Sequence, residues 1–191
     1  MKLSVSTRVA ENFRDKRQAT VELEDLAEIA AREGYYAVCM RASQVGIEDR
    51  REQIRAASAT LTQNNLAVSM VTGDFAIPEN SVDGPAALHN IEPYLDLADD
   101  LGCDLLRICM KTADDIRWAR DAADAAMERG LRLAHQSHTA SLFETVDETL
   151  EVLRSVGRSN FGLIYEPANL ELCGQPYTGD CLEALYPWIF N

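Results

Sequence analysis

Two stretches decide the fold: Leu131-Arg-Leu-Ala-His-Gln-Ser-His138 and Phe161-Gly-Leu-Ile-Tyr-Glu-Pro-Ala-Asn169. Each is an apolar run that ends in polar residues able to bind a metal ion, and one amphipathic helical pattern lies between them. This rhythm is typical of parallel βα repeats, in which ligands gather where the strands end. Because alternate side chains of a strand share a face, we expect Gln136 and Glu166 to meet at one site, with His135 on the opposite, packed face.

The same rhythm runs through the rest of the chain. Short runs rich in Leu or β-branched residues predict strands that are buried on both faces, at residues 2–7, 36–41, 67–72, 104–109, 131–135 and 161–166. Helical patterns occupy residues 20–34, 49–65, 85–102, 112–130 and 142–156. Thr20 is the expected N-cap of the first helix, and three of the helices end on Gly just before a strand, which is typical of αβ loops. We therefore expect one α/β domain over residues 1–191.

The number of repeats bears on the architecture. A closed eightfold barrel typically needs about 250 residues, and this chain has 191. We expect a (β/α) barrel with about six of its eight repeats present, in which residues 185–191 approach a further strand. An open flavodoxin-like sheet is the alternative, but residues 6–12, after the first strand, contain no glycine and so lack the nucleotide-binding fingerprint.

The composition narrows the class of partner. The chain has 31 acidic and 18 basic residues, a formal net charge of -13, which disfavours nucleic acid because phosphate backbones are repelled. No apolar run approaches the roughly 18 residues that cross a bilayer, so we expect no membrane partner, and the N-terminus lacks the apolar core of a signal peptide. Five cysteines without a CxxC pair indicate reduced thiols in the cytosol. A small molecule is the expected ligand of a cytoplasmic protein.

The two polar motifs resemble those of the xylose-isomerase-like TIM barrels, the sugar phosphate isomerase/epimerase group. Members commonly carry Glu-Asn-His after the fifth strand and Asp-Pro-Gly-His or Asp-Pro-Gly-Asn after the sixth. The matching residues here are Gln136-Ser-His138 and Glu166-Pro-Ala-Asn169. The resemblance implies a divalent cation (Mn, Mg, Co or Zn) held by Gln136, Glu166 and two ligands from strands beyond Asn191. Because Gln136 offers only a neutral oxygen, we expect this metal to be held weakly.

The resemblance also implies an activity, the isomerisation or epimerisation of a small sugar, sugar phosphate or other polyhydroxy carbonyl compound. Glu166 and His138 are the catalytic residues that it implies, since carboxylates of the family move a proton at the carbon beside a metal-polarised carbonyl. Asn169 either contacts the substrate or is an ordinary turn residue. A keto-inositol dehydratase and a non-catalytic binding or assembly module are the alternatives, and the chain is expected to be inactive on its own if the missing strands are needed.

Three basic residues complete the expected site. Arg41 and Arg107 close the second and fourth strands, and Lys111 follows the fourth. An arginine at a strand end forks onto a carboxylate or phosphate of the substrate, or else pairs with a neighbouring acidic residue. Because an incomplete barrel leaves open strand edges, we also expect the chain to form a homo-oligomer.

Overall fold

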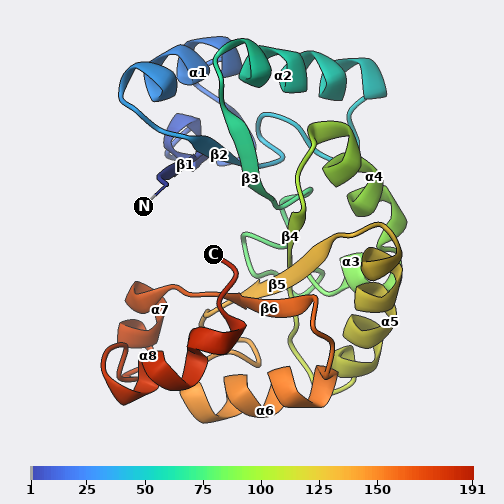
Figure 1. Cartoon of the computed structure of the whole chain (residues 1–191), viewed down its shortest axis with the longest axis vertical. Helices are drawn as coiled ribbons and strands as arrows, with labels where there is room; N and C mark the ends of the chain where they lie inside the picture. The colour runs from blue at the N-terminus through green and yellow to red at the C-terminus, as the bar shows by residue number, and fades with distance from the viewer. Residues whose placement is uncertain (1) are drawn as a thin grey trace. The chain divides into compact units, whose positions relative to one another are not determined.

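The computed structural model describes residues 2–191 and contains six parallel strands that alternate with helices (Figure 1). The α/β fold class expected from the sequence is confirmed, and consecutive strands pair in chain order. The strands are β1 (Ser4–Ser6), β2 (Ala37–Met40), β3 (Ala67–Val71), β4 (Leu105–Ile108), β5 (Arg132–Gln136) and β6 (Phe161–Ile164).

The described residues form two compact units, 2–75 with 92–106 and 76–91 with 107–191. The division falls within β4, so that each unit holds part of this strand. The expectation of a single domain over residues 1–191 stays a prediction, and each unit is described by itself below.

The first unit holds β1, β2 and β3 with three covering helices. These are α1 (Leu23–Arg32), α2 (Arg51–Gln63) and α4 (Glu92–Leu101), and the short 3-10 turn η1 (Thr7–Ala10) follows β1. Helix α2 contacts both α1 and α4. The buried faces of the helices and strands form the core, with Ala27, Val38, Met40, Leu61 and Leu95 almost completely excluded from solvent.

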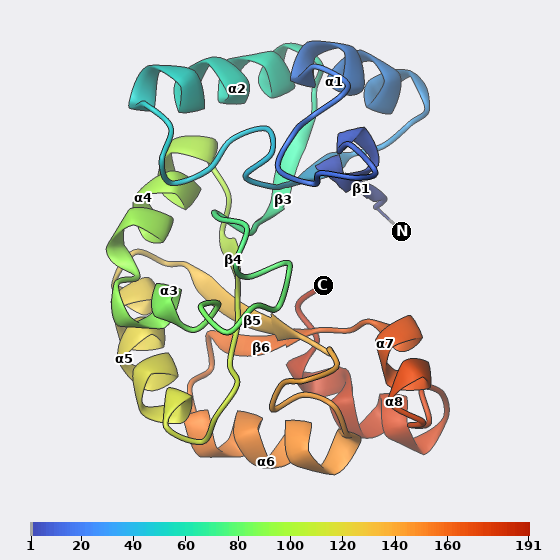
Figure 2. The same cartoon turned by 180° about the vertical axis from the view of Figure 1, so that it is seen from behind.

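The second unit holds β5 and β6 in a continuous parallel ladder, in which Gln136 is in register with Ile164. Its helices are α3 (Ala86–His89), α5 (Asp115–Glu128), α6 (Val146–Val156), α7 (Pro167–Leu172) and α8 (Asp180–Leu185), followed by the 3-10 turn η2 (Tyr186–Trp188). Helix α3 lies beside α5 (Figure 2). Among residues 2–191, no helix has both the length and the apolar character needed to cross a bilayer.

The residues after η2 pair with the outer edge of β6. Ile189 forms a parallel bridge with Leu163, whose carbonyl accepts a hydrogen bond from the N–H of Phe190 at 2.9 Å. Gly162 makes this approach feasible, since a Cβ there would lie 2.5 Å from the carbonyl oxygen of Trp188. Of residues 185–191, which were predicted to approach a further strand, residues 185–188 are helical, and only the residues after them pair, through one isolated bridge to β6.

One expected helix is wrong. The pattern over residues 85–102 indicated a single helix, but the structure has α3 and α4, separated at Asn90 by an extended backbone (φ −145°, ψ 70°). Pro93 explains the break. It has no N–H to donate to the carbonyl of His89, so a helix cannot run through it from α3, but it fits the first turn of α4, where no donor is needed.

The starts of α1, α2, α5 and α6 were also placed too early, by two to four residues. Thr20 does not cap α1, because its hydroxyl donates to the carbonyl of Ala10 and the helix begins after Glu22. Helix α6, predicted over residues 142–156, begins four residues later, at Val146. The hydroxyl of Thr145 caps it by accepting the N–H of Glu148 at 3.2 Å. The predicted glycines after α1, α4 and α5 are confirmed as positive-φ residues.

Candidate functional site

The carboxyl ends of β5 and β6 bring two of the predicted site residues together. Nε2 of Gln136 lies 3.2 Å from Oε2 of Glu166 and donates a hydrogen bond to it. Both side chains are half-buried. Glu166 is the N-cap residue of α7, and its side chain makes no capping hydrogen bond. Pro167 follows it at the start of the helix, where its missing N–H costs nothing. The predicted convergence of these two side chains is therefore confirmed, and their chemical roles stay predictions.

His138 and Asn169 flank this pair. The side-chain amide of Asn169 donates to the carbonyl of Ser137 at 2.8 Å, and so ties the start of α7 to the end of β5. Nδ1 of His138 lies 3.0 Å from the carbonyl of Thr139. Between them, the hydroxyl of Ser137 is buried and meets no hydrogen-bond partner among residues 2–191. Asn169 thus acts on the loop backbone, whichever of its two predicted readings holds.

His135 is packed, as its position on the opposite face predicted. Its ring stacks on Phe143 with centroids 4.1 Å apart, and Nδ1 lies 2.6 Å from the carbonyl of Gln136. A neutral imidazole must carry its proton on Nδ1 to donate this bond. Burial lowers the pKa of His135 to about 3, and the positive charge of Arg107 adds to the effect. His135 is therefore uncharged at neutral pH.

Lys111 binds backbone carbonyls in the second unit. Its ammonium donates to the carbonyl of Asn80 at 2.8 Å and to that of Ala140 at 2.7 Å. Asn80 also donates to the carbonyl of Thr139 through its side chain, and both Asn80 and Ala140 have positive φ. Lys111 therefore joins the loop after β3 to the loop after β5, and Asn80 is a partner that no sequence pattern had indicated. Arg107 is buried in the same unit.

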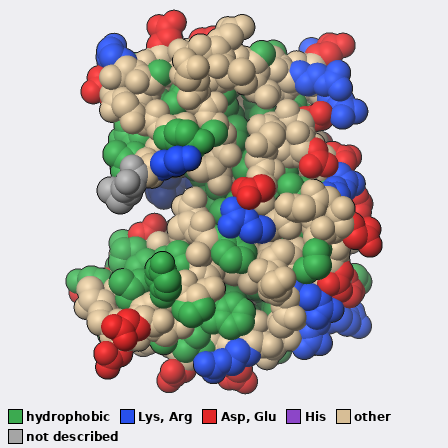
Figure 3. Space-filling view, in the orientation of Figure 1, with side chains coloured by type: hydrophobic (Ala, Val, Ile, Leu, Met, Phe, Trp, Pro, Cys, Tyr) green, Lys and Arg blue, Asp and Glu red, His purple; other side chains and the backbone are tan. Residues whose placement is uncertain are grey.

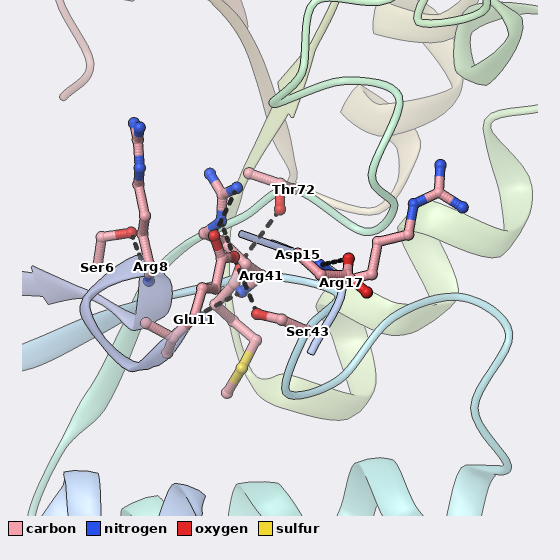
Figure 4. A network of polar contacts seen from close by, with 10 residues as sticks. Ser6, Arg8, Glu11, Asp15, Arg17, Arg41, Ser43 and Thr72 are labelled. Atoms are coloured by element: carbon pink, nitrogen blue, oxygen red, sulfur yellow. Dashed lines mark hydrogen bonds and ion pairs between the residues drawn. The ribbon is translucent and has the colours of Figure 1, made fainter. Parts of the chain in front are cut away.

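Arg41 in the first unit forms a buried ion pair with Glu11 (Figure 4). Nε donates to Oε1 of Glu11 at 2.5 Å and Nη2 to Oε2 at 3.2 Å, a bidentate contact. The side chains are only 8% and 2% exposed. The hydroxyl of Ser43 donates to Glu11 at 2.9 Å, and Thr7 accepts the N–H of Arg41 at 3.1 Å. Of the two alternatives that the sequence left open for Arg41, the structure contains the pairing with a neighbouring acidic residue.

The residues present do not complete a divalent metal site. No group of three or more His, Cys, Asp or Glu side chains suited to a metal ion occurs in the described part of the chain. Gln136 and Glu166 supply one carboxylate and one amide, and the amide turns its nitrogen toward the carboxylate. An amide nitrogen does not ligate a hard cation, and such cations gather several oxygen ligands. A cation here would need Gln136 to rotate and further ligands to join.

Comparisons with known proteins agree with this architecture. A family profile described as Xylose isomerase-like TIM barrel matches residues 27–186. No curated protein sequence matches the chain significantly.

Several solved structures share the fold. The probable 3-DHS dehydratase AsbF involved in petrobactin synthesis from Bacillus anthracis superposes with a TM-score of 0.78 at 18% identity, over 99% of this chain and 71% of that one. A D-psicose 3-epimerase gives 0.77 at 13% identity, over 99% and 71%. A xylose isomerase-like TIM barrel protein from Mycobacterium smegmatis in complex with magnesium gives 0.74 at 15%, over 98% and 72%. At these identities the likeness shows a shared fold, and it confirms the expected partial TIM barrel.

Proposed function

Because the chain belongs to the xylose isomerase-like TIM barrel family, we propose that it isomerises or epimerises a small polyhydroxy carbonyl compound. The meeting of Gln136 and Glu166 at the ends of β5 and β6 is the observation that carries this proposal, since carboxyl ends of strands hold the active sites of such barrels. The related D-psicose 3-epimerase was studied in the presence of D-fructose, so ketohexoses are the first substrates to test.

Glu166 is the proposed proton-transfer residue. A carboxylate accepts several hydrogen bonds, so the bond from Gln136 leaves it able to accept a substrate proton. It removes the proton from the carbon beside the carbonyl and returns it. His138 is the second proposed proton-transfer group. Substrate oxygens are proposed to be bound by Asn169, Arg107 and Lys111. The ammonium group of Lys111 has three N–H donors, of which two bind backbone carbonyls and the third is available to the substrate.

Metal binding is proposed to be weak, because Gln136 and Glu166 carry one negative charge between them. Gln136→Glu should tighten Mn²⁺ binding, since a second carboxylate would face the first. Glu166→Gln should abolish what binding there is. Calorimetric titration with Mn²⁺ measures both effects, and nanomolar binding by the unaltered chain, or unchanged binding by Glu166→Gln, would show that the metal lies elsewhere.

Deuterium exchange tests the reaction itself. The chain is incubated with Mg²⁺, which unlike Mn²⁺ does not broaden NMR signals, and with ketohexoses in D₂O. NMR then follows loss of the proton beside the carbonyl together with formation of the epimer or aldose. We expect exchange by the unaltered chain and loss of roughly a hundredfold or more in Glu166→Gln, in line with general-base catalysis. Glu171→Gln removes the same charge from an exposed position in α7 and should leave the rate unchanged. No exchange over background would contradict the proposal.

The same spectra separate the rival functions. A dehydratase would release water and produce an olefinic proton signal, and AsbF is the relative that makes this reading worth testing. A binding module would broaden or shift the sugar signals without exchange. We also propose a cytoplasmic location, which suits five cysteines that form no disulfide within residues 2–191.

Self-association is proposed from the surface of α7 and α8. Hydrophobic side chains gather over these helices in Figure 3, and Leu172 and Tyr186 are among the most exposed apolar residues of the second unit. Exposed apolar patches of this kind favour association. Sedimentation velocity should show a dimer or larger species, and a monomer at high concentration would contradict this.

A further inference from the structure

The loop after β1 has a charge opposite to that of the chain as a whole. Residues 8–17 contain four basic and two acidic side chains, whereas the whole chain has 18 basic and 31 acidic residues. One of the two acidic side chains, Glu11, is neutralised by the buried pair with Arg41. The field around this loop is therefore set by its basic side chains, in a protein that otherwise repels anions.

A cavity of about 430 Å³ opens in this loop, within the first unit. Its polar lining consists of Arg8, Lys16, Asn12 and the neutralised Glu11. Its volume lies in the range of small-molecule sites. The cavity thus presents two cations to a ligand, while Arg41 cancels the charge of the single carboxylate that lines it.

The donors of this cavity are not committed to other residues. Neither Arg8 nor Lys16 has an ion-pair partner within residues 2–191, and the Arg8 guanidinium in Figure 4 meets none of the residues drawn there. Oδ1 of Asn12 accepts the N–H groups of Arg14 and Asp15 at 2.8 and 3.2 Å. Those bonds fix the orientation of the Asn12 amide and leave its NH₂ as a donor.

The rim of the cavity is apolar. Phe13 is 97% exposed and Val9 is 67% exposed, and both line the cavity. The solvent-exposed ring of Phe13 lies beside the cations Arg8 and Lys16. This combination suits a ligand that has both a carbon skeleton and a negatively charged group.

From these observations we propose that the loop after β1 is a binding site for a small organic oxyanion. The phosphate or carboxylate of the ligand is held by Arg8, Lys16 and the amide of Asn12, and its carbon skeleton lies on Phe13 and Val9. Glu11, whose charge is neutralised by Arg41 behind it, forms the floor. The site belongs to the first unit and does not depend on the catalytic role proposed for Glu166.

Calorimetry or NMR titration tests this site directly, first with inorganic phosphate. Fructose 6-phosphate, gluconate and fructose then separate a phosphate ester from a carboxylate and from a neutral sugar. We expect one or both of the anionic compounds to bind, with affinity that falls as salt is added, and fructose to bind at least tenfold more weakly. No binding of any anion by the unaltered chain would overturn the proposal.

Variants of single loop residues locate the anion. Arg8→Gln and Lys16→Gln should each weaken the binding of anions about tenfold, the equivalent of one charge-assisted hydrogen bond. Arg14→Gln removes the same charge from an exposed side chain outside the cavity and should change the affinity less than twofold. Equal losses in Arg8→Gln and Arg14→Gln would mean unspecific attraction and would overturn the site.

Phe13→Ser tests the apolar rim. It should weaken the organic anions severalfold and leave inorganic phosphate unchanged, because phosphate has no carbon skeleton to contact the ring. Weakening of both probes alike would contradict the proposed orientation. All four variants alter exposed side chains, so the fold should persist, and unchanged circular dichroism confirms it.

Discussion

Acidification should destabilise the chain through His135. The folded protein lowers the pKa of this imidazole to about 3, because the ring is buried against Phe143. In the unfolded chain the ring binds a proton near pH 6.5. The folded-state pKa is thus depressed below the unfolded value. The contribution of a neutral His135 to the free energy of unfolding is therefore fully present above about pH 6.5 and is lost as the pH drops toward 3.

The size of the effect follows from the gap between the two pKa values. One pKa unit corresponds to about 1.4 kcal/mol. At pH 5 the solution is about 1.5 units below the unfolded pKa and still above the folded one, so the free energy of unfolding should be about 2 kcal/mol lower than at pH 7. The carboxyl groups of Asp and Glu in unfolded chains titrate mainly below about pH 5, outside the range from pH 7 to pH 5. A loss of this size is a large part of the 5–15 kcal/mol typical of a domain.

Urea unfolding at pH 7, 6 and 5 measures this loss. His135→Phe keeps an aromatic ring against Phe143 and removes the titrating group, so its free energy of unfolding should lose about 2 kcal/mol less than that of the unaltered chain between pH 7 and pH 5. His89→Gln replaces an exposed histidine and should retain the full dependence on pH. Equal losses in the unaltered chain and His135→Phe would refute the reasoning.

Gly162→Ala should loosen the C-terminal residues from β6, because the added Cβ would lie 2.5 Å from the Trp188 carbonyl oxygen and 2.7 Å from the Phe190 ring. We expect a loss of about 1–3 kcal/mol in urea unfolding and faster amide exchange at Phe190, and unchanged exchange there would contradict the pairing. Lys111→Met keeps the length of the side chain but removes the donor to the Ala140 carbonyl. It should cost about 1–3 kcal/mol and expose residues 138–144 to proteolysis, and a cleavage pattern like that of the unaltered chain would contradict the role of Lys111 as a loop tie.

The repeat pattern was sufficient to predict the strands and the meeting of two distant side chains. Strand periodicity determines which residues share a face, and parallel pairing brings the ends of adjacent strands to one edge. Gln136 and Glu166 could therefore be placed together from sequence, and His135 on the packed face, although 30 residues separate the first two. Periodicity determines the face of the strand to which a side chain points. It therefore predicted the positions of these residues but not their chemical roles.

The loop contacts could not be predicted in this way. Glu11, Ser43 and Asn80 lie in segments without hydrophobic periodicity, and their partners are about 30 residues away on other loops. Such contacts depend on the path of the backbone between elements. Asn80 shows the difficulty well, because its role depends on a positive φ that nothing in the flanking sequence requires.

The Gln136–Glu166 pair differs in its electrostatics from a pair of carboxylates at the same strand ends. Two half-buried carboxylates within hydrogen-bond distance would repel each other and would need a metal ion or a shared proton between them. An amide in the first position removes that repulsion and donates a hydrogen bond to the remaining carboxylate. Gln136 therefore lowers by one the charge that these strand ends could offer a cation and, by the same chemistry, lowers the electrostatic cost of bringing the two side chains together.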